Sequence, residues 1–255
     1  MNGCDEVWPT LAHQPELKPG DVHIWRAVLD QPAAVCCELE LGLSADERAR
    51  AARFHFPHDR WRFTVARGVL RQIIGAYLGV QPDDVQFKYG RQGKPALDAG
   101  TPPRRLCFNT SHSRALALFA LSRDRELGVD VEYMRAVPDA AHIAERFFSK
   151  SENAALKALP PEQQHEAFFN CWTRKEAYVK AIGDGLSRPL HGFDVSLSPG
   201  EPAQLTRVDG DEYEAHRWSM LDLAPGPGYR GALVVEGECP RLSCFTFPLP
   251  GGIEQ

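Results

Sequence analysis

The chain has 255 residues, 43% of them hydrophobic, which is enough to bury a real core in one large domain or two small ones. The formal net charge of −5 gives no general electrostatic case for nucleic-acid binding. The first 19 residues are polar and proline-bearing, unlike a signal peptide, and the apolar runs are too short to cross a membrane. We therefore expect a cytoplasmic monomer with neither nucleic-acid nor membrane partners.

The cysteines agree with that expectation. They are odd in number, form no C-x-x-C pair and show no Cys/His spacing typical of zinc. Reduced thiols in the cytosol are the simplest account of this set. The seven are Cys4, Cys36, Cys37, Cys107, Cys171, Cys239 and Cys244.

The first half of the chain predicts a strand at 22–28 followed by helices. Ser44 and Glu47 form a capping box, which starts a helix running to about Phe54. A long amphipathic helix then covers about 60–78 and stops near Gly79. This helical stretch concentrates basic residues that either serve an anionic ligand or form a solvated face: Arg48, Arg50, Arg53, Arg60, Arg62, Arg67 and Arg71.

A polar motif, Phe108-Asn109-Thr110-Ser111-His112-Ser113, lies between two predicted strands at 106–108 and 115–121. Its hydroxyl, amide and imidazole groups, with loop N–H groups, could bind phosphate oxygens. An ordinary turn is the alternative, since Asn and Ser favour turns. A Ser–His hydrolase is disfavoured because adjacent residues rarely pair in this way and no G-x-S-x-G elbow is present.

An acidic motif, Gly128-Val129-Asp130-Val131-Glu132, follows. On a strand, residues two apart point to the same side, so both carboxylates should face one way while both valines face a core. A solvated strand face is the ordinary explanation of such a pattern. The motif indicates metal binding only if further carboxylates lie close to Asp130 and Glu132.

The second half repeats the helical pattern of the first. Ser149 and Glu152 form another capping box, 105 residues after the first, and a short helix runs to Leu159. A long helix follows at about 162–182 and stops at Gly183. Strands are expected at 192–197, 214–221 and 231–235. A pseudo-two-fold relation between the halves would bring a basic face of one half toward an acidic face of the other, and pockets often form at such junctions.

The long second helix carries Trp172-Thr173-Arg174-Lys175-Glu176-Ala177-Tyr178-Val179-Lys180. Glu176 and Lys180 are spaced i, i+4 and share one helical face. Alone, such a pair is usually a surface salt bridge. Together with Asp130 and Glu132, Glu176 would complete a three-carboxylate oxygen site suited to Mg²⁺ bound to a substrate phosphate. Lys180 would suit the phosphate charge.

In this order, the three motifs resemble the signature of the two-domain, Sfp-type 4′-phosphopantetheinyl transferases of the holo-acyl carrier protein synthase superfamily. The resemblance extends to the turn Arg91-Gln92-Gly93-Lys94-Pro95, to the helix around Ala66–Arg71 and to Arg146-Phe147-Phe148-Ser149. It spans roughly residues 45–195. It implies an α+β fold of two halves related by a pseudo-two-fold, expected at 1–124 and 125–255, with the active site and coenzyme A in the cleft between them.

The resemblance also implies the reaction and the residues. The enzyme would use Mg²⁺ to move the 4′-phosphopantetheine arm of coenzyme A onto a serine of an acyl or peptidyl carrier protein, releasing 3′,5′-ADP. Asp130, Glu132 and Glu176 would hold the metal, and Glu176 is the first candidate for the base. Lys180 would meet a phosphate oxygen. The full set expected at the co-substrate is Arg67, Arg91, Lys94, Asn109, Thr110, Ser111, His112, Asp130 and Lys180.

One departure from the family concerns the 3′-phosphate. Family members often carry lysines before the first long helix, whereas this chain has Phe56-Pro57-His58. Either Arg53, Arg60 or Arg62 substitutes, or the contact is weaker.

Two other classes of function stay open. One is a Mg²⁺-dependent hydrolase of a nucleotide pyrophosphate, in which water replaces the serine. The other is a non-catalytic module that binds coenzyme A or a carrier protein. Fatty-acid, polyketide and nonribosomal-peptide carriers all present a similar serine, so each is a candidate acceptor.

Overall fold

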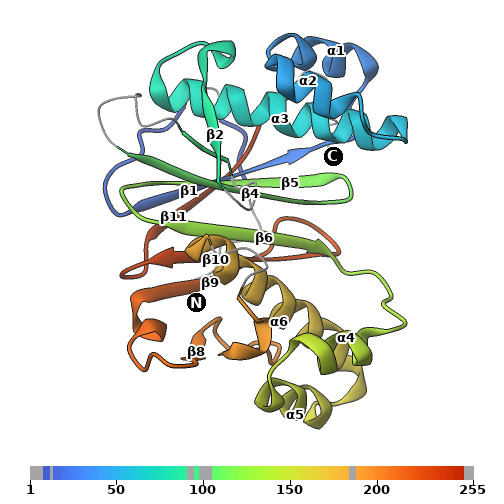
Figure 1. Cartoon of the computed structure of the whole chain (residues 1–255), viewed down its shortest axis with the longest axis vertical. Helices are drawn as coiled ribbons and strands as arrows, with labels where there is room; N and C mark the ends of the chain where they lie inside the picture. Colours follow the sequence, from blue (N-terminus) through green and yellow to red (C-terminus); the bar gives the residue numbers. More distant parts are fainter. Residues whose placement is uncertain (1–7, 12–13, 91–94, 98–104, 184–187, 250–255) are drawn as a thin grey trace.

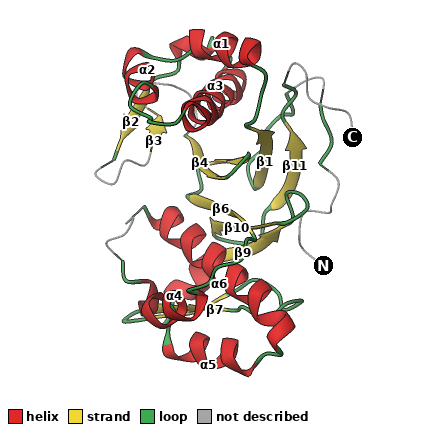
Figure 2. Cartoon of the chain, turned by 90° about the vertical axis from the view of Figure 1, so that its right-hand side faces the viewer, coloured by secondary structure: helices red, strands yellow, loops and turns green. Residues whose placement is uncertain are grey.

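Two β-sheets lie face to face between two groups of helices (Figures 1 and 2). The computed structural model describes residues 8–11, 14–90, 95–97, 105–183 and 188–249. Helices α1–α3 cover one sheet, and α4–α6 lie on the far side of the other (Figure 2). The molecule therefore has four layers, with helices outside and sheets inside, and belongs to the expected α+β class.

The same order of elements occurs twice along the chain. A strand is followed by two short helices, a long helix, a two-stranded hairpin and two further strands. In the first copy these are β1 (Asp21–Val28), α1 (Ala33–Leu41), α2 (Ala45–Ala51), α3 (Pro57–Leu78), β2 (Phe87–Tyr89), β3 (Pro95–Leu97), β4 (Leu106–Ser113) and β5 (Leu116–Arg123).

The second copy runs from β6 to β10, and one more strand closes the chain. Its elements are β6 (Leu127–Tyr133), α4 (Ala140–Phe147), α5 (Lys150–Ala158), α6 (Pro161–Ile182), β7 (Phe193–Val195), β8 (Leu205–Val208), β9 (Trp218–Leu223), β10 (Tyr229–Glu236) and finally β11 (Arg241–Thr246). This repeat is the structural counterpart of the pattern seen in the sequence.

The sheets repeat the same connectivity. Their strand orders are β11-β1-β5-β4 and β6-β10-β9, so β1, β5 and β4 correspond to β6, β10 and β9. All of these pairings are antiparallel except that of β11, which runs parallel to β1. The expected division near residue 124 falls between β5 and β6, but β11 returns from the second half to join the first sheet.

Capping explains where the helices begin and end. The side chains of Ser44 and Ser149 accept hydrogen bonds from the N–H groups of Glu47 and Glu152, and both glutamates bond back, so both predicted capping boxes are confirmed. The two long helices, α3 and α6, each have 22 residues. They end at Gly79 and Gly183, whose φ angles of 70° and 78° favour glycine.

Strand alternation explains the core between the sheets. Val129 and Val131 are fully buried there against Ile24 and Leu118. Asp130 and Glu132, which alternate with these valines, point the other way, toward a cavity that they help to line. The predicted facing of the acidic motif is therefore confirmed.

The polar motif differs from its expectation as a loop. Residues 109–113 continue strand β4 and pair with β5 along its whole length. The backbone of the motif pairs with β5 on one edge, and its side chains accept hydrogen bonds from backbone N–H groups of β6, so the polar residues have partners within a strand. The expected strand at 214–221 also begins later, at Trp218, after a 3-10 turn at Glu214–Arg217.

The expectation of a fully reduced set of cysteines is wrong, because Cys244 takes part in a disulfide. Five other cysteines are free thiols: Cys36, Cys37, Cys107, Cys171 and Cys239. Within the described ranges, no helix combines the length and apolar character needed to cross a membrane.

Candidate active site

Strands β4 and β6 meet through side chains. The N–H groups of alternate β6 residues donate to the polar motif: Val129 to Asn109 Oδ1 at 2.9 Å, Val131 to Ser111 Oγ at 3.3 Å and Tyr133 to Ser113 Oγ at 3.1 Å. A buried N–H group needs such an acceptor. The polar motif thus joins the two sheets and sets the acidic motif beside it.

Gly128 brings α6 directly onto β6. A Cβ atom at this position would lie 2.1 Å from the carbonyl oxygen of Ala177 and 2.4 Å from the backbone nitrogen of Ala181. Only a residue without a side chain allows this approach. The contact places the Glu176–Lys180 turn of the helix over the carboxylates of the strand.

The ammonium group of Lys180 lies at the centre of this junction. Its Nζ lies 2.7 Å from Asp130 Oδ1, 2.9 Å from Ser111 Oγ and 3.2 Å from the carbonyl oxygen of Val129. The Ser111 hydroxyl also donates to Asp130 Oδ1 at 2.8 Å. These contacts come from β4, β6 and α6, so Ser111, Asp130 and Lys180, each singled out from the sequence, lie together at one point of the structure. They engage the Ser111 hydroxyl with an acid and a lysine, unlike a Ser–His nucleophile.

The other two carboxylates lie in the electrostatic field of Asp130. Partial burial raises the pKa of Glu132, and the negative charge of Asp130 raises it further, against a hydrogen bond from Ser113 that lowers it. Burial likewise raises the pKa of Glu176, and both Asp130 and Glu132 add to the rise. The three acids therefore repel one another when ionised, and a cation between them would relieve that repulsion.

Asp130 leaves one oxygen available for such a cation. The residue is 4% exposed, and its buried Oδ2 has no hydrogen-bond partner among the described residues. Within the described ranges, no three acidic, histidine or cysteine side chains are already grouped closely enough to form a finished metal site. An orphaned carboxylate oxygen beside two repelling carboxylates nevertheless fits a hard, oxygen-seeking ion such as Mg²⁺.

A cavity of about 420 Å³ opens above this junction and lies between the two halves. Basic groups and aromatic rings share its wall. Its lining residues are Arg50, Phe63, Ala66, Arg67, Leu70, Tyr89, Pro95, Thr110, Ser111, His112, Ala117, Phe119, Asp130, Glu132 and Lys180. Strands β4 and β6 form one wall and supply five of the side chains proposed to bind the co-substrate or the metal. The opposite wall comes from α2, α3 and the β2–β3 hairpin.

Not every proposed residue lies on that wall. Among the described residues, two of those proposed, Asn109 and Glu176, do not line the cavity. Asn109 is buried where β4 meets β6. Glu176 is close enough to Asp130 for the negative charge of Asp130 to raise its pKa. Arg91 and Lys94 lie outside the described residues. Arg50, Phe63 and Tyr89 were not singled out from the sequence, although Arg50 belongs to the arginine-rich stretch.

Arg67 and Arg71 of α3 have different roles. Arg67 reaches the cavity, where Nε bonds Glu47 Oε1 at 3.0 Å and the guanidinium also contacts the Tyr89 hydroxyl and the Phe87 ring. Arg71 is 3% exposed and bonds Glu47 Oε2 at 2.6 Å, so it is part of the fold. Glu47 is thus both a helix cap and the anchor that orients Arg67.

His112 is the most exposed polar residue of the β4 segment in the wall. Desolvation of its ring lowers its pKa, and the positive charges of Lys180 and Arg62 lower it further, against the opposing effect of Asp130. The ring therefore tends to be neutral near pH 7, when it can donate one hydrogen bond to an anion but carries no charge.

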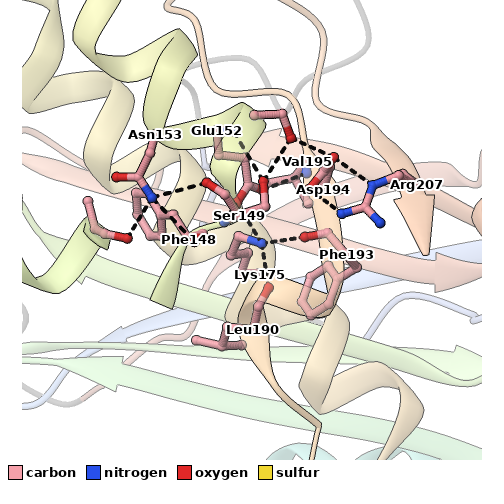
Figure 3. A network of polar contacts seen from close by, with 12 residues as sticks. Phe148, Ser149, Glu152, Asn153, Lys175, Leu190, Phe193, Asp194, Val195 and Arg207 are labelled. Carbon is pink, nitrogen blue, oxygen red and sulfur yellow. Dashed lines mark hydrogen bonds and ion pairs between the residues drawn. The ribbon is translucent and has the colours of Figure 1, made fainter. Parts of the chain in front are cut away.

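The residue before Glu176 anchors the helix (Figure 3). Lys175 is fully buried, and its Nζ lies 2.7 Å from the Leu190 carbonyl, 2.6 Å from the Phe193 carbonyl and 2.8 Å from Glu152 Oε2. Glu152 in turn accepts from the N–H groups of Ser149 and Val195. Lys175 is a structural residue, and its network fixes the turn of α6 from which Glu176 and Lys180 project.

The site thus belongs to an α+β enzyme whose cavity suits an anionic, phosphate-bearing ligand with an aromatic group. A family model described as the 4′-phosphopantetheinyl transferase superfamily matches residues 126–234. Another, described as the N-terminal part of 4′-phosphopantetheinyl transferases, matches residues 30–123.

Individual relatives agree. The chain is 45% identical to the 4′-phosphopantetheinyl transferase HetI of Nostoc sp. over 85% of this chain and 88% of that protein. It is 37% identical to a putative 4′-phosphopantetheinyl transferase of Synechocystis sp., over 77% of each chain. It is 32% identical to Sfp of Bacillus subtilis over 61% of this chain and 66% of that protein.

This chain belongs to the 4′-phosphopantetheinyl transferase superfamily and is of the Sfp type. It is a transferase enzyme, and the substrates of the family are coenzyme A and carrier protein domains.

Proposed function

We propose that this enzyme transfers the 4′-phosphopantetheine arm of coenzyme A to a carrier-protein serine with the help of Mg²⁺ and releases 3′,5′-ADP. The observation that supports this most is the junction of Asp130, Ser111 and Lys180 at the floor of a basic cavity. The serine oxygen attacks the phosphorus that carries the pantetheine arm. The bond from that phosphorus to the bridging oxygen breaks, and 3′,5′-ADP leaves with the bond's electrons.

The cavity walls suit the nucleotide of coenzyme A. The rings of Phe63 and Tyr89 offer faces on which a purine can stack. Arg50, Arg67 and His112 offer donors to its phosphates. We propose Arg91 and Lys94 as further phosphate contacts on the strength of the family resemblance. Thr110 and Ser111 line the same wall, whereas Asn109 acts by holding β6.

The acidic residues would hold the metal. Asp130, with its orphaned Oδ2, would be one ligand, and Glu132 and Glu176 would be the others. When bound there, Mg²⁺ would neutralise charge on the phosphates. Lys180 holds Asp130 by Oδ1, which keeps Oδ2 directed elsewhere, and the positive charge of its ammonium group would attract a phosphate in the same cavity.

Glu176 is the proposed acceptor of the serine proton. Burial and the neighbouring acids raise its pKa, which makes its carboxylate a better proton acceptor near neutral pH than an exposed glutamate. The proton moves from the carrier serine oxygen to a Glu176 carboxylate oxygen as the new bond to phosphorus forms. No nucleophile from this chain is required.

The two halves would divide these tasks. We propose that residues 1–124 supply the nucleotide wall and residues 125–255 the metal and base. One chain contributes both walls of the cavity, which supports a monomeric enzyme. A cytoplasmic location is part of the same proposal.

A mass measurement tests the function. The enzyme is incubated with coenzyme A, Mg²⁺ and a panel of apo-carriers, and each carrier is then weighed intact. We expect one phosphopantetheine to be added, 3′,5′-ADP to be released, and EDTA to stop both. Release of free phosphopantetheine without any carrier would instead indicate a pyrophosphate hydrolase, and an unchanged carrier with intact coenzyme A would indicate a binding module.

A further inference from the structure

Two serine hydroxyls on β4 make the same pair of contacts with β6. Ser111 Oγ accepts from the Val131 N–H and donates to the carboxylate of the preceding residue, Asp130. Ser113 Oγ accepts from the Tyr133 N–H and donates to the carboxylate of its preceding residue, Glu132, at 2.7 Å. The unit therefore repeats at two-residue spacing along both strands.

The chemistry of a hydroxyl makes this unit directional. A serine has one proton to give and lone pairs to receive. Because a backbone N–H can only donate, it directs the hydroxyl proton toward the carboxylate. Asn109 has the corresponding place opposite Val129, but the residue before Val129 is Gly128, so Asn109 orients no acid. Orientation of acids is thus specific to the two serines.

The side chain of Glu132 lies at the border of two cavities. It lines the main cavity, and it also lines a smaller pocket of about 140 Å³. The other side chains of that pocket are the basic Arg135 and apolar groups such as Trp172. The positive charge of Arg135 favours the ionised form of Glu132. The hydrogen bond from Ser113 fixes Oε2 against β4 and so holds the carboxylate on the side of Asp130 and Lys180.

We propose that Ser113 is a positioning residue that holds Glu132 for metal binding, with Oε2 bound by the serine and Oε1 left for the cation. This rests on the proposed function, in which Glu132 is a metal ligand. Residues that orient a ligand are commonly worth about 10–100-fold in metal affinity or activity. Ser113 touches neither the cavity floor nor any reacting group, because it acts through Glu132.

The test compares serine variants by metal binding without turnover. Mn²⁺ is titrated calorimetrically into wild type, Ser113→Ala, Ser113→Thr and Glu132→Ala in the presence of 3′,5′-ADP. We expect Ser113→Ala to weaken Mn²⁺ binding by about tenfold or more. Ser113→Thr keeps the hydroxyl and should restore it. In turnover assays, KM for coenzyme A should change little while the Mg²⁺ dependence shifts to higher concentration.

Two controls keep the outcomes distinct. Ser122→Ala removes a serine of the neighbouring strand whose hydroxyl bonds the Arg125 carbonyl and no acid, and it should bind Mn²⁺ as wild type does. If Ser113→Ala does not fold, Ser113→Cys, which keeps the size but is a weak donor, takes its place. Wild-type Mn²⁺ affinity in the folded Ala or Cys variant, with a clear loss in Glu132→Ala, would overturn the inference. Wild-type affinity in Glu132→Ala would instead refute the proposed ligand set.

Discussion

Lys180 and Asp130 form an ion pair of 2.7 Å between Nζ and Oδ1, although they are 50 residues apart in the chain and lie on different elements. The lysine has an exposed fraction of 29% and the aspartate of 6% in their side chains, so the pair connects the cavity to the interior. It also leaves Glu132 and Glu176 as the less compensated acids of the cluster. The behaviour of the enzyme should depend on how these charges are balanced.

Arg67 should matter more for binding coenzyme A than for turnover. It offers a positive charge to the ligand in the ground and transition states alike, so Arg67→Met should raise KM more than it lowers kcat. Arg241→Met is the matched control, because Arg241 is an exposed arginine that pairs with Asp21 outside the cavity. Steady-state kinetics with coenzyme A and with dephospho-coenzyme A measure the effect. If KM is the same in both variants as in wild type, Arg67 does not contact the nucleotide.

Glu176→Gln separates the role of metal ligand from that of base. The substitution keeps the size of the side chain and one acceptor oxygen but removes its basicity. If Glu176 takes the serine proton, a loss of kcat of about 10²-fold or more should persist at saturating Mg²⁺. The acidic limb of the kcat pH profile should flatten as well. Full rescue by Mg²⁺ with an unchanged profile would show that Glu176 only ligates.

The stability of the metal-free protein should fall as Glu176 ionises. Its pKa in the folded state is raised above the ordinary value of 4.5, so its contribution to stability is complete below that pH and is lost as pH rises through the folded pKa. Glu176→Gln does not ionise and should melt at a higher temperature than wild type near neutral pH. The difference should vanish in acid.

Melting curves with EDTA, recorded across this pH range, provide the test. Glu162→Gln, a substitution at an exposed position on the same helix, is the control and should show no such crossover. Addition of Mg²⁺ should reduce the advantage of Glu176→Gln. Equal melting temperatures of Glu176→Gln and wild type at every pH would mean that neither burial nor the neighbouring acids disfavour the ionised form of Glu176.

The Lys175–Glu152 pair should be costly to break from one side. Lys175→Met leaves the carboxylate of Glu152 buried without its cation, a change that typically destabilises by about 3–5 kcal/mol. Lys175→Met combined with Glu152→Gln removes both charges and should recover part of that loss. Urea denaturation gives the free energies of unfolding. A single variant as stable as wild type would contradict the anchoring role of this network.

Much of the architecture could be predicted because it depends on local chemistry. The capping boxes at Ser44 and Ser149 and the stop signals at Gly79 and Gly183 act through neighbouring backbone groups, and all four are confirmed. The facing of Val129 and Asp130 follows from strand alternation alone. Helical periodicity likewise places Glu176 and Lys180, which are four residues apart, on one face of α6.

The remaining features depend on contacts between distant residues. The motif at Asn109–Ser113 looked like a loop because its residues favour turns, and it became a strand because β6 supplies N–H donors to its side chains. The pairing of β11 with β1 joins opposite ends of the chain, and no local sequence pattern predicts that pairing. Nothing in the local sequence distinguishes Ser113 from the rest of the polar motif, since its partner Glu132 lies on another strand.

The most direct test of the account is the rate of carrier modification by Asp130→Asn. The variant keeps the size of the side chain but cannot supply an anionic oxygen to a cation or a full charge to Lys180. Asp30→Asn removes a surface carboxylate that pairs with Arg62, a type of contact that contributes little, and is the control. Intact-mass measurements of an apo-carrier over time, with coenzyme A and saturating Mg²⁺, give both rates. We expect Asp130→Asn to be folded but slower by about 10²-fold or more, and Asp30→Asn to behave as wild type. A folded Asp130→Asn variant that modifies the carrier at the wild-type rate would contradict it.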